Sequence, residues 1–141
     1  KIYMLKNRKE SKALISLVAN KEQLNTLIKD VPSDAENNNP TTIIYQNVTG
    51  LASNLLAEDG SAAIRIVKDE FCKNLILTLG NAIVSTSANI SGERYPQQFS
   101  EIATEIIDNV DYVVNLRKNE IMSTSSDILK INIDGNVEKI R

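Results

Sequence analysis

Hydrophobic and polar residues follow two different periods along the chain, and together they predict a single domain of the α/β (α+β) class. Short apolar runs of strand length lie at residues 13–19, 42–45, 62–67, 82–84, 112–114, 127–133 and 137–140. Apolar residues at helical spacing lie at 21–29, 68–79 and 100–107, and a short helix is expected over 52–56. Because strands and helices alternate, we expect a mixed sheet.

Local signals set the expected boundaries of these elements. Asn20 is a suitable N-cap for the helix over 21–29, Ser100 for the helix through Ile107, and Gly80 ends the helix over 68–79. Residues 32–40 are polar and predict a loop, and Asp134-Gly135 predicts a tight turn before an edge or hairpin strand at 137–140. The helix over 68–79 is expected to bury one apolar face, formed by Phe71, Cys72, Leu75, Ile76 and Leu79.

Composition excludes several classes of site. The 141 residues contain no His, and Cys72 is the lone Cys. Catalysis by His, an intrachain disulfide and a zinc site built from Cys and His are therefore excluded, and a reducing, cytoplasmic location is expected. No apolar run reaches the roughly 18 residues that a membrane span needs, and no signal peptide opens the chain, so we expect no membrane contact. The chemistry must use Lys, Arg, Ser, Thr, Asn, Asp or Glu.

Charge is distributed unevenly. The whole chain carries −2, but residues 1–12 carry +4, because five basic residues stand against Glu10. Lys6, Arg8 and Lys12 are all even-numbered, so an extended backbone would project them from one face, where they could neutralise a polyphosphate. The alternative is a solvated basic helix end favoured by the helix dipole.

A second candidate is the segment of small residues from Ser85 to Gly92, which directly follows an apolar strand. Small side chains let a backbone approach a ligand closely, and successive N–H groups can bind an anion. Ligands of α/β sheets favour the carboxyl ends of strands, where this segment would begin. An ordinary turn rich in Ser and Asn remains the alternative, and the pattern of a Walker loop is absent.

Two further features involve strands. Arg65 interrupts an otherwise apolar strand, so a side chain pointing away from Ile64 and Ile66 could bind a carboxylate through two hydrogen bonds. A structural salt bridge or an exposed sheet face would explain Arg65 equally. Residues 123–127, Ser-Thr-Ser-Ser-Asp, place several hydroxyls and a carboxylate before a strand and are a weak signal alone.

Taken together, these blocks resemble the YrdC-like family, the L-threonylcarbamoyl-AMP synthases of tRNA modification. The resemblance rests on five blocks in the family's order, the fourth being the most specific: Lys6-Asn7-Arg8 with Lys12, Pro40-x-Thr42, Ala63-Ile64-Arg65-Ile66, Ser85-Thr86-Ser87-Ala88-Asn89-Ile90-Ser91-Gly92, and Ser123-Thr124-x-x-Asp127. It implies a YrdC-like domain over residues 1–141, with a twisted mixed sheet and helices around a concave basic pocket.

The resemblance also implies a reaction. L-Threonine, bicarbonate or CO2, and ATP with Mg²⁺ would form threonylcarbamoyl-AMP and pyrophosphate, and a downstream threonylcarbamoyl transferase would pass the group to tRNA. By resemblance, Lys6, Arg8 and Lys12 are the catalytic cations, and no protein side chain is predicted to bind the metal. The ATP-binding set is Arg8, Lys12, Ser61, Ser87, Asn89 and Arg141. The threonine-binding set is Arg65, Ser85 and Ser123.

The chain departs from the family pattern at its beginning. The Pro-Thr-Asp/Glu-Thr-x-Tyr-Gly pattern is absent, and residues 1–6 read as the end of a helix, so we expect an N-terminal strand or helix of the domain to be missing. Two other hypotheses remain open. One is a non-catalytic YrdC-like module that binds double-stranded RNA or tRNA in a basic concavity, and the other is the YrdC-like part of a larger carbamoyltransferase of the hydrogenase-maturation type.

Overall fold

The computed structural model describes residues 1–7, 14–29, 31, 40–123, 125–132 and 135–140. The chain forms two compact units, of which the first comprises residues 1–12 and 86–125 and the second residues 13–85 and 126–141. Every strand of the described chain belongs to the second unit, and the described part of the first unit consists of short helices and connecting segments.

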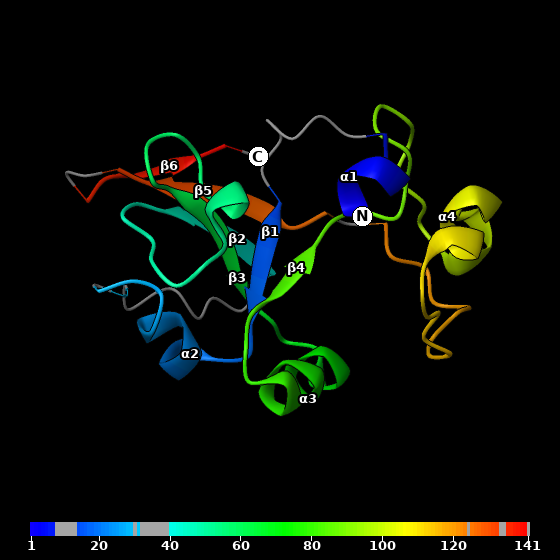
Figure 1. The fold of residues 1–141 in the computed structure, drawn as a ribbon, viewed down its shortest axis with the longest axis horizontal. Coiled ribbons are helices and arrows are strands. Elements are labelled where there is room, and N and C mark those ends of the chain that lie inside the picture. Colours follow the sequence, from blue (N-terminus) through cyan, green and yellow to red (C-terminus); the bar gives the residue numbers. More distant parts are fainter. Residues whose placement is uncertain (8–13, 30, 32–39, 124, 133–134, 141) are drawn as a thin grey trace. The chain divides into compact units, whose positions relative to one another are not determined.

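A six-stranded sheet organises the second unit (Figure 1). Its order is β4–β1–β3–β2–β5–β6, and the strands are β1 (Ile15–Val18), β2 (Thr41–Tyr45), β3 (Ala62–Ile66), β4 (Ile83–Ser85), β5 (Asp127–Ile131) and β6 (Val137–Lys139). The pairs β1–β3 and β2–β5 are parallel, and the other neighbours are antiparallel. This mixed sheet with its helices confirms the predicted fold class, and β6 is the edge strand of a hairpin, as expected.

Side chains alternate along each strand, so they lie on two different faces of the sheet. Val18, Ile43 and Ile64 lie on one face and are buried in a core that also contains Leu24, Leu27 and Ile28. The opposite face carries Leu17 and Ile83, which pack against a smaller cluster of Ala19, Val67 and Ile76. Since side chains of a strand alternate between faces, Arg65 lies on the second face, away from the larger core, as its sequence context predicts.

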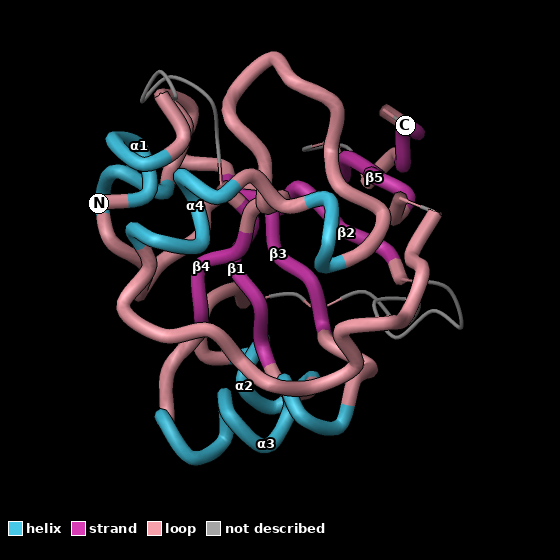
Figure 2. The backbone as a smooth tube through the Cα atoms, turned by 90° about the vertical axis from the view of Figure 1, so that its right-hand side faces the viewer, coloured by secondary structure: helices cyan, strands magenta, loops and turns pink. Residues whose placement is uncertain are grey.

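Helices α2 (Lys21–Asn25) and α3 (Glu70–Leu79) follow the carboxyl ends of β1 and β3 and lie at the same end of the sheet (Figure 2). The Asn20 side chain accepts a hydrogen bond from the Gln23 N–H at 2.9 Å, which confirms the predicted cap. Gly80 ends α3 in the left-handed conformation at φ 74°. A 3₁₀ turn, η2 (Ser53–Leu55), stands where a short helix was expected.

Helix α3 is confirmed, but only part of its predicted apolar face is buried. Ile76 is fully buried and Cys72 is partly buried, but Phe71, Leu75 and Leu79 are 40–56% exposed. Helical spacing shows which apolar residues share one side of a helix, but it does not show how much of that side packs against the rest of the protein. Here the small cluster around Ala19 and Val67 contacts only the strip of α3 that carries Cys72 and Ile76.

In the first unit, α1 (Ile2–Leu5) confirms the expected helix end at the start of the chain and lies beside α4 (Thr104–Asn109) (Figure 2). The expected helix from Ser100 through Ile107 is confirmed only in its second half, which belongs to α4, and its predicted start at Ser100 is wrong. Residues Phe99–Glu101 form a 3₁₀ turn, η3, and Ile102 is extended at φ −71° and ψ 127° before α4 begins. Ala103, at φ −57° and ψ 137°, is not helical either, so the backbone of residues 102 and 103 separates η3 from α4.

The expected strand at 112–114 is also wrong. These residues form no strand, and the described part of the first unit contains no sheet edge with which they could pair. Tyr112 is 79% exposed. An apolar, β-branched run predicts a strand only where a partner strand exists. The other strands match their predictions within about two residues, which is ordinary variation at element ends. The predicted loop at 32–40 falls mostly outside the described residues.

We expect Gly80→Ala to destabilise the protein by about 1 kcal/mol, because a left-handed backbone is costly for any residue with a Cβ. No atom lies within 4 Å of the position that the new Cβ would occupy, so the cost is purely conformational. Urea unfolding followed by circular dichroism measures it, with the adjacent exposed Asn81→Ala as the control. Equal stability of the two variants would contradict this account of the helix end.

Candidate functional site

In the first unit, Lys6 is the centre of a hydrogen-bonded cluster with the segment that follows β4. The Lys6 side chain is almost completely buried, with 3% of the residue exposed. Its ammonium donates to the carbonyl oxygens of Ser87 and Asn89 and, at 3.3 Å, to Asn89 Oδ1. The structure therefore brings together three of the predicted site residues, Lys6, Ser87 and Asn89.

Asn89 extends this cluster through both ends of its amide. Its Oδ1 accepts hydrogen bonds from the Ser87 hydroxyl and from Lys6. Its Nδ2 donates to the Ile90 carbonyl at 3.1 Å and to the Glu93 carbonyl at 2.7 Å. The Asn89 side chain, which is predicted to contact a nucleotide, thus also stabilises the backbone conformation of residues 87–93.

The local backbone explains how Lys6 reaches this position. Lys6 directly follows α1, and Asn7 adopts a left-handed conformation at φ 49°, which Asn tolerates better than most residues. The Ser91 N–H donates to the Lys6 carbonyl oxygen at 2.8 Å. The main chain and the side chain of Lys6 therefore both bind the segment 87–91.

In the second unit, Arg65 projects from β3 between hydroxyl groups of neighbouring elements. Its Nε donates to Thr42 Oγ1 at 2.9 Å, and its Nη2 donates to the same oxygen and to Ser126 Oγ. Thr42 is fully buried. These contacts fix the plane of the guanidinium and engage its Nε and Nη2 groups.

Ser85 and Lys130 lie on the same face of the sheet as Arg65. Ile15 of β1 is paired with both Ala63 and Ser85, and Ile44 of β2 is paired with both Ala63 and Lys130. Paired residues share a face of the sheet, so these residues form one row across it. Arg65 lies two residues beyond Ala63 along β3, and it therefore lies on the same face as this row. Sequence reasoning missed Lys130, although it interrupts an apolar strand just as Arg65 does, and that signal could have found it.

Ser61 belongs to a turn directly before β3. Its N–H donates to Asp59 Oδ1 at 3.0 Å. A hydrogen bond from the Ser61 side chain is the main cause that holds the pKa of Asp59 below its usual value, followed by this backbone bond and by the charge of Lys130. Ser61 therefore supports an ionised carboxylate beside the strand that carries Arg65.

The remaining predicted residues are separate or lie outside the described chain. Ser123, in the first unit, is exposed, and its carbonyl oxygen accepts the Tyr95 hydroxyl at 3.1 Å. Arg8, Lys12 and Arg141 lie outside the described residues. The cationic trio of Lys6, Arg8 and Lys12 and the predicted concave basic pocket therefore stay predictions.

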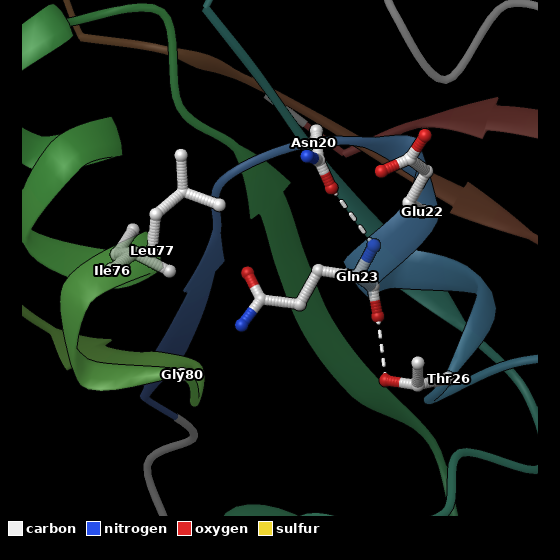
Figure 3. A pocket seen from close by; sticks show the side chains of 7 residues that line it. All are labelled: Asn20, Glu22, Gln23, Thr26, Ile76, Leu77 and Gly80. Carbon is white, nitrogen blue, oxygen red and sulfur yellow. Dashed lines mark hydrogen bonds between the residues drawn. The ribbon is translucent and has the colours of Figure 1, made fainter.

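A surface pocket of the second unit contains none of the predicted site residues (Figure 3). It lies between α2 and α3 and is lined by Asn20, Glu22, Gln23, Thr26, Ile76, Leu77 and Gly80. Asn20 and Gln23 use their side chains to accept backbone N–H groups around the start of α2. Two of the polar side chains that line this pocket are therefore engaged in hydrogen bonds at the start of α2.

Within the described residues, no three or more His, Cys, Asp or Glu side chains are grouped so that they could hold a metal ion. None of the helices in this part of the chain has the length and hydrophobicity that a membrane span requires.

The Sua5/YciO/YrdC family model, described as telomere recombination, matches residues 1–141. The chain belongs to this family. The match confirms the YrdC-like resemblance drawn from the five sequence blocks, because it covers the whole chain in which those blocks occur.

Two curated relatives of this chain carry the name threonylcarbamoyl-AMP synthase. The protein from Idiomarina loihiensis is 28% identical over 123 residues, which are 82% of this chain and 66% of that protein. The protein from Methylococcus capsulatus is 35% identical over 100 residues, which are 67% of this chain and 54% of that protein. The chain thus spans less than two thirds of the length of these relatives.

Two solved structures share the fold. P. abyssi Sua5 complexed with L-threonine has a TM-score of 0.83 at 21% identity, covering 99% of this chain and 42% of that one. Full-length HypF in the phosphate- and nucleotide-bound form has a TM-score of 0.76 at 19% identity, covering 99% of this chain and 22% of that one. At these identities, the likeness establishes the fold.

We expect Ser61→Ala to raise the pKa of Asp59, because the variant removes the side-chain hydrogen bond that chiefly lowers it. A lowered pKa stabilises the folded state above the usual carboxyl pKa, and this contribution is lost as the pH falls through the lowered folded value. Carbon-13 NMR titration of the Asp59 carboxyl measures the shift. Ser53→Ala, an exposed serine in η2, is the control, and an unchanged Asp59 pKa in Ser61→Ala would contradict the assigned cause.

Proposed function

We propose that the protein containing this chain is an L-threonylcarbamoyl-AMP synthase. It joins L-threonine, bicarbonate or CO2, and ATP into threonylcarbamoyl-AMP and releases pyrophosphate. The observation that carries the proposal is the match of residues 1–141 to the Sua5/YciO/YrdC family, in which the relatives described above bear this name.

The reaction demands positioning more than covalent catalysis. The threonine nitrogen adds to CO2 and loses a proton, giving a carbamate. A carbamate oxygen then attacks the α-phosphorus of ATP, and the bond from that phosphorus to the bridging oxygen breaks as pyrophosphate leaves. Because charge accumulates on the departing phosphates, fixed cations and N–H groups supply the main stabilisation. A chain without His is suited to such a step.

In this proposal, the Arg65 guanidinium binds the carboxylate of threonine. Thr42 and Ser126 hold the guanidinium plane through hydrogen bonds, so little rotamer freedom remains to be lost on binding. Ser85, on the same face of the sheet, and Ser123 are assigned to the threonine and carbamate by the family resemblance.

Arg8 and Lys12 bind the ATP phosphates in this proposal, and Lys6 belongs to the same cationic set. Ser61, Ser87, Asn89 and Arg141 are assigned to the nucleotide. Mg²⁺ enters as the magnesium complex of ATP, which needs no ligand set of its own among the protein side chains. These assignments follow the family resemblance, and the buried Lys6–Asn89 cluster supports the part that falls on residues 6 and 87–89.

The product identifies the class of reaction that follows. Threonylcarbamoyl-AMP is a mixed anhydride that water hydrolyses, so we propose that a threonylcarbamoyl transferase consumes it in the cytoplasm by acylating an adenosine of tRNA. Binding of tRNA by the synthase itself is a separate proposal, and it predicts an affinity that falls steeply with salt.

The direct test of the proposed function is release of pyrophosphate by the whole protein. We expect release from ATP to require both L-threonine and bicarbonate, and to stop when either is omitted. Mass spectrometry of the products identifies threonylcarbamoyl-AMP. Release of pyrophosphate that ignores threonine would refute the assignment, and salt-sensitive RNA binding without any ATP binding would favour the non-catalytic alternative.

We expect Arg65→Gln to raise the KM for L-threonine by about tenfold to a hundredfold, the range for loss of a hydrogen bond to a charged group. The KM for ATP should change little, because the assigned contact is with the carboxylate of threonine. Initial rates of pyrophosphate release give both constants. Arg94→Gln, at an exposed arginine in the first unit, removes the same charge as a control. Equal effects on the two substrates would contradict the role of Arg65.

A further inference from the structure

Thr42 belongs to one of the five sequence blocks, Pro40-x-Thr42, but the proposed function assigns it no contact with a substrate. It lies in β2, beside β3, which carries Arg65. Ile43 is paired with Ile64 in the antiparallel β2–β3 ladder. The residues one step further along these strands, Thr42 and Arg65, therefore lie opposite each other, and opposed residues share a face of the sheet. The fold thus places a hydroxyl directly beside the Arg65 side chain.

The Thr42 hydroxyl oxygen accepts hydrogen bonds from two nitrogen atoms of the Arg65 guanidinium, from Nε at 2.9 Å and from Nη2. Among the described residues, Arg65 is the only hydrogen-bond partner of this hydroxyl. Thr42 is 0% exposed, so its hydroxyl cannot also contact a bound substrate. Any effect of this hydroxyl on a substrate is therefore exerted through Arg65.

The position of the Thr42 oxygen is fixed by its surroundings. Strand β2 is paired on both sides, with β3 and with β5, so the backbone at Thr42 cannot shift without disturbing two ladders. A β-branched side chain also has few χ1 rotamers. An arginine side chain, in contrast, is long and has many rotamers, so a fixed acceptor beside it selects among them.

Valine would suit position 42 in every respect except the hydrogen bonds to Arg65. It has nearly the same shape as threonine, and β-branched apolar residues are favoured in buried strands. A buried hydroxyl is tolerated only when it is hydrogen-bonded. Orientation of the Arg65 guanidinium therefore accounts for a threonine at this fully buried site.

Ser126 provides a second contact with the guanidinium. It precedes β5 and accepts one hydrogen bond, from Nη2 of Arg65. Ser126 is half-buried, and the chain enters the second unit at this residue. The two acceptors belong to different parts of the sheet, one in β2 and one ahead of β5. Together they restrict rotation of the guanidinium as well as its position.

We propose that Thr42 is a positioning residue, with Ser126 in a supporting role, and that their hydroxyl groups hold Arg65 in the orientation in which it binds the carboxylate of threonine. The identity of this ligand rests on the proposed function, whereas the orienting contacts rest on the structure. Hydrogen bonds formed before binding reduce the conformational freedom that the ligand would otherwise have to remove. Thr42 therefore raises the affinity for threonine without touching it.

Thr42→Val tests this role in the whole protein. We expect the KM for L-threonine to rise about tenfold, the loss expected for a hydrogen bond to a charged group, while kcat and the KM for ATP change little. Thr42→Ser retains the hydroxyl and should keep the KM for threonine close to that of the unaltered protein. Thr78→Val removes an exposed threonine hydroxyl from α3 and is the control.

NMR of the Arg65 Nε–H group reports its orientation without any measurement of turnover. The signal is identified by its loss in Arg65→Gln. We expect the Nε proton to exchange with water about tenfold faster in Thr42→Val than in the unaltered protein, because its acceptor is removed. The Nε–H signal of Arg94, an exposed arginine of the first unit, is the internal reference.

Unchanged proton exchange in Thr42→Val would refute the orienting contact. Faster exchange with an unchanged KM for threonine would refute the positioning role, and so would an equal rise in both KM values. If Thr42→Val fails to fold, Ser126→Ala takes its place with a smaller rise in the KM for threonine expected, and an unchanged KM would then refute the proposal. Pyrophosphate release that ignores threonine would refute the proposed function, while exchange of the Arg65 proton would still decide the orienting contact.

Discussion

The burial of the Lys6 ammonium is the constraint on which the candidate site depends. An ammonium removed from water is costly unless its hydrogen bonds are satisfied, and here the backbone of residues 87–89 provides oxygen acceptors. Those acceptors are neutral, so these contacts solvate the charge without cancelling it. The segment 87–91 therefore cannot relax independently of Lys6.

In the second unit, hydrogen bonds to neutral oxygen atoms also hold the side chain of Arg65. Its guanidinium is half-buried and receives hydroxyl oxygens from Thr42 and Ser126, which fix its plane while adding no formal negative charge. In both units, neutral oxygen atoms accept hydrogen bonds from a buried or half-buried cation. Hydrogen bonds that hold a cation in one orientation reduce the reorganisation that binding of an anion would require. A carboxylate of threonine and the phosphates of ATP are the anions that the proposed reaction supplies.

Sequence reasoning recovered the sheet because periods of two residues survive wherever a strand is half-buried, and Arg65 could be assigned to its face for that reason. It failed at Ser100, where the backbone of Ile102 and Ala103 interrupts the helix, and at Tyr112, where the described part of the first unit offers no partner strand. It also described Lys6 only as a cation of a basic segment. Its burial follows from contact with residues more than eighty positions away, which no local pattern encodes. Lys130 was missed although it carries the same signal as Arg65.

The two edges of the sheet have a consequence for the behaviour of the protein in solution. Both β4 and β6 are only three residues long, and β6 carries Glu138 and Lys139 on an exposed strand, with Lys139 paired to Asp127 at 2.9 Å. An incoming chain can form few ladder hydrogen bonds along so short an edge, and at β6 it must also displace charged side chains. Both edges of the described sheet therefore disfavour intermolecular strand addition, although its central strands are strongly apolar.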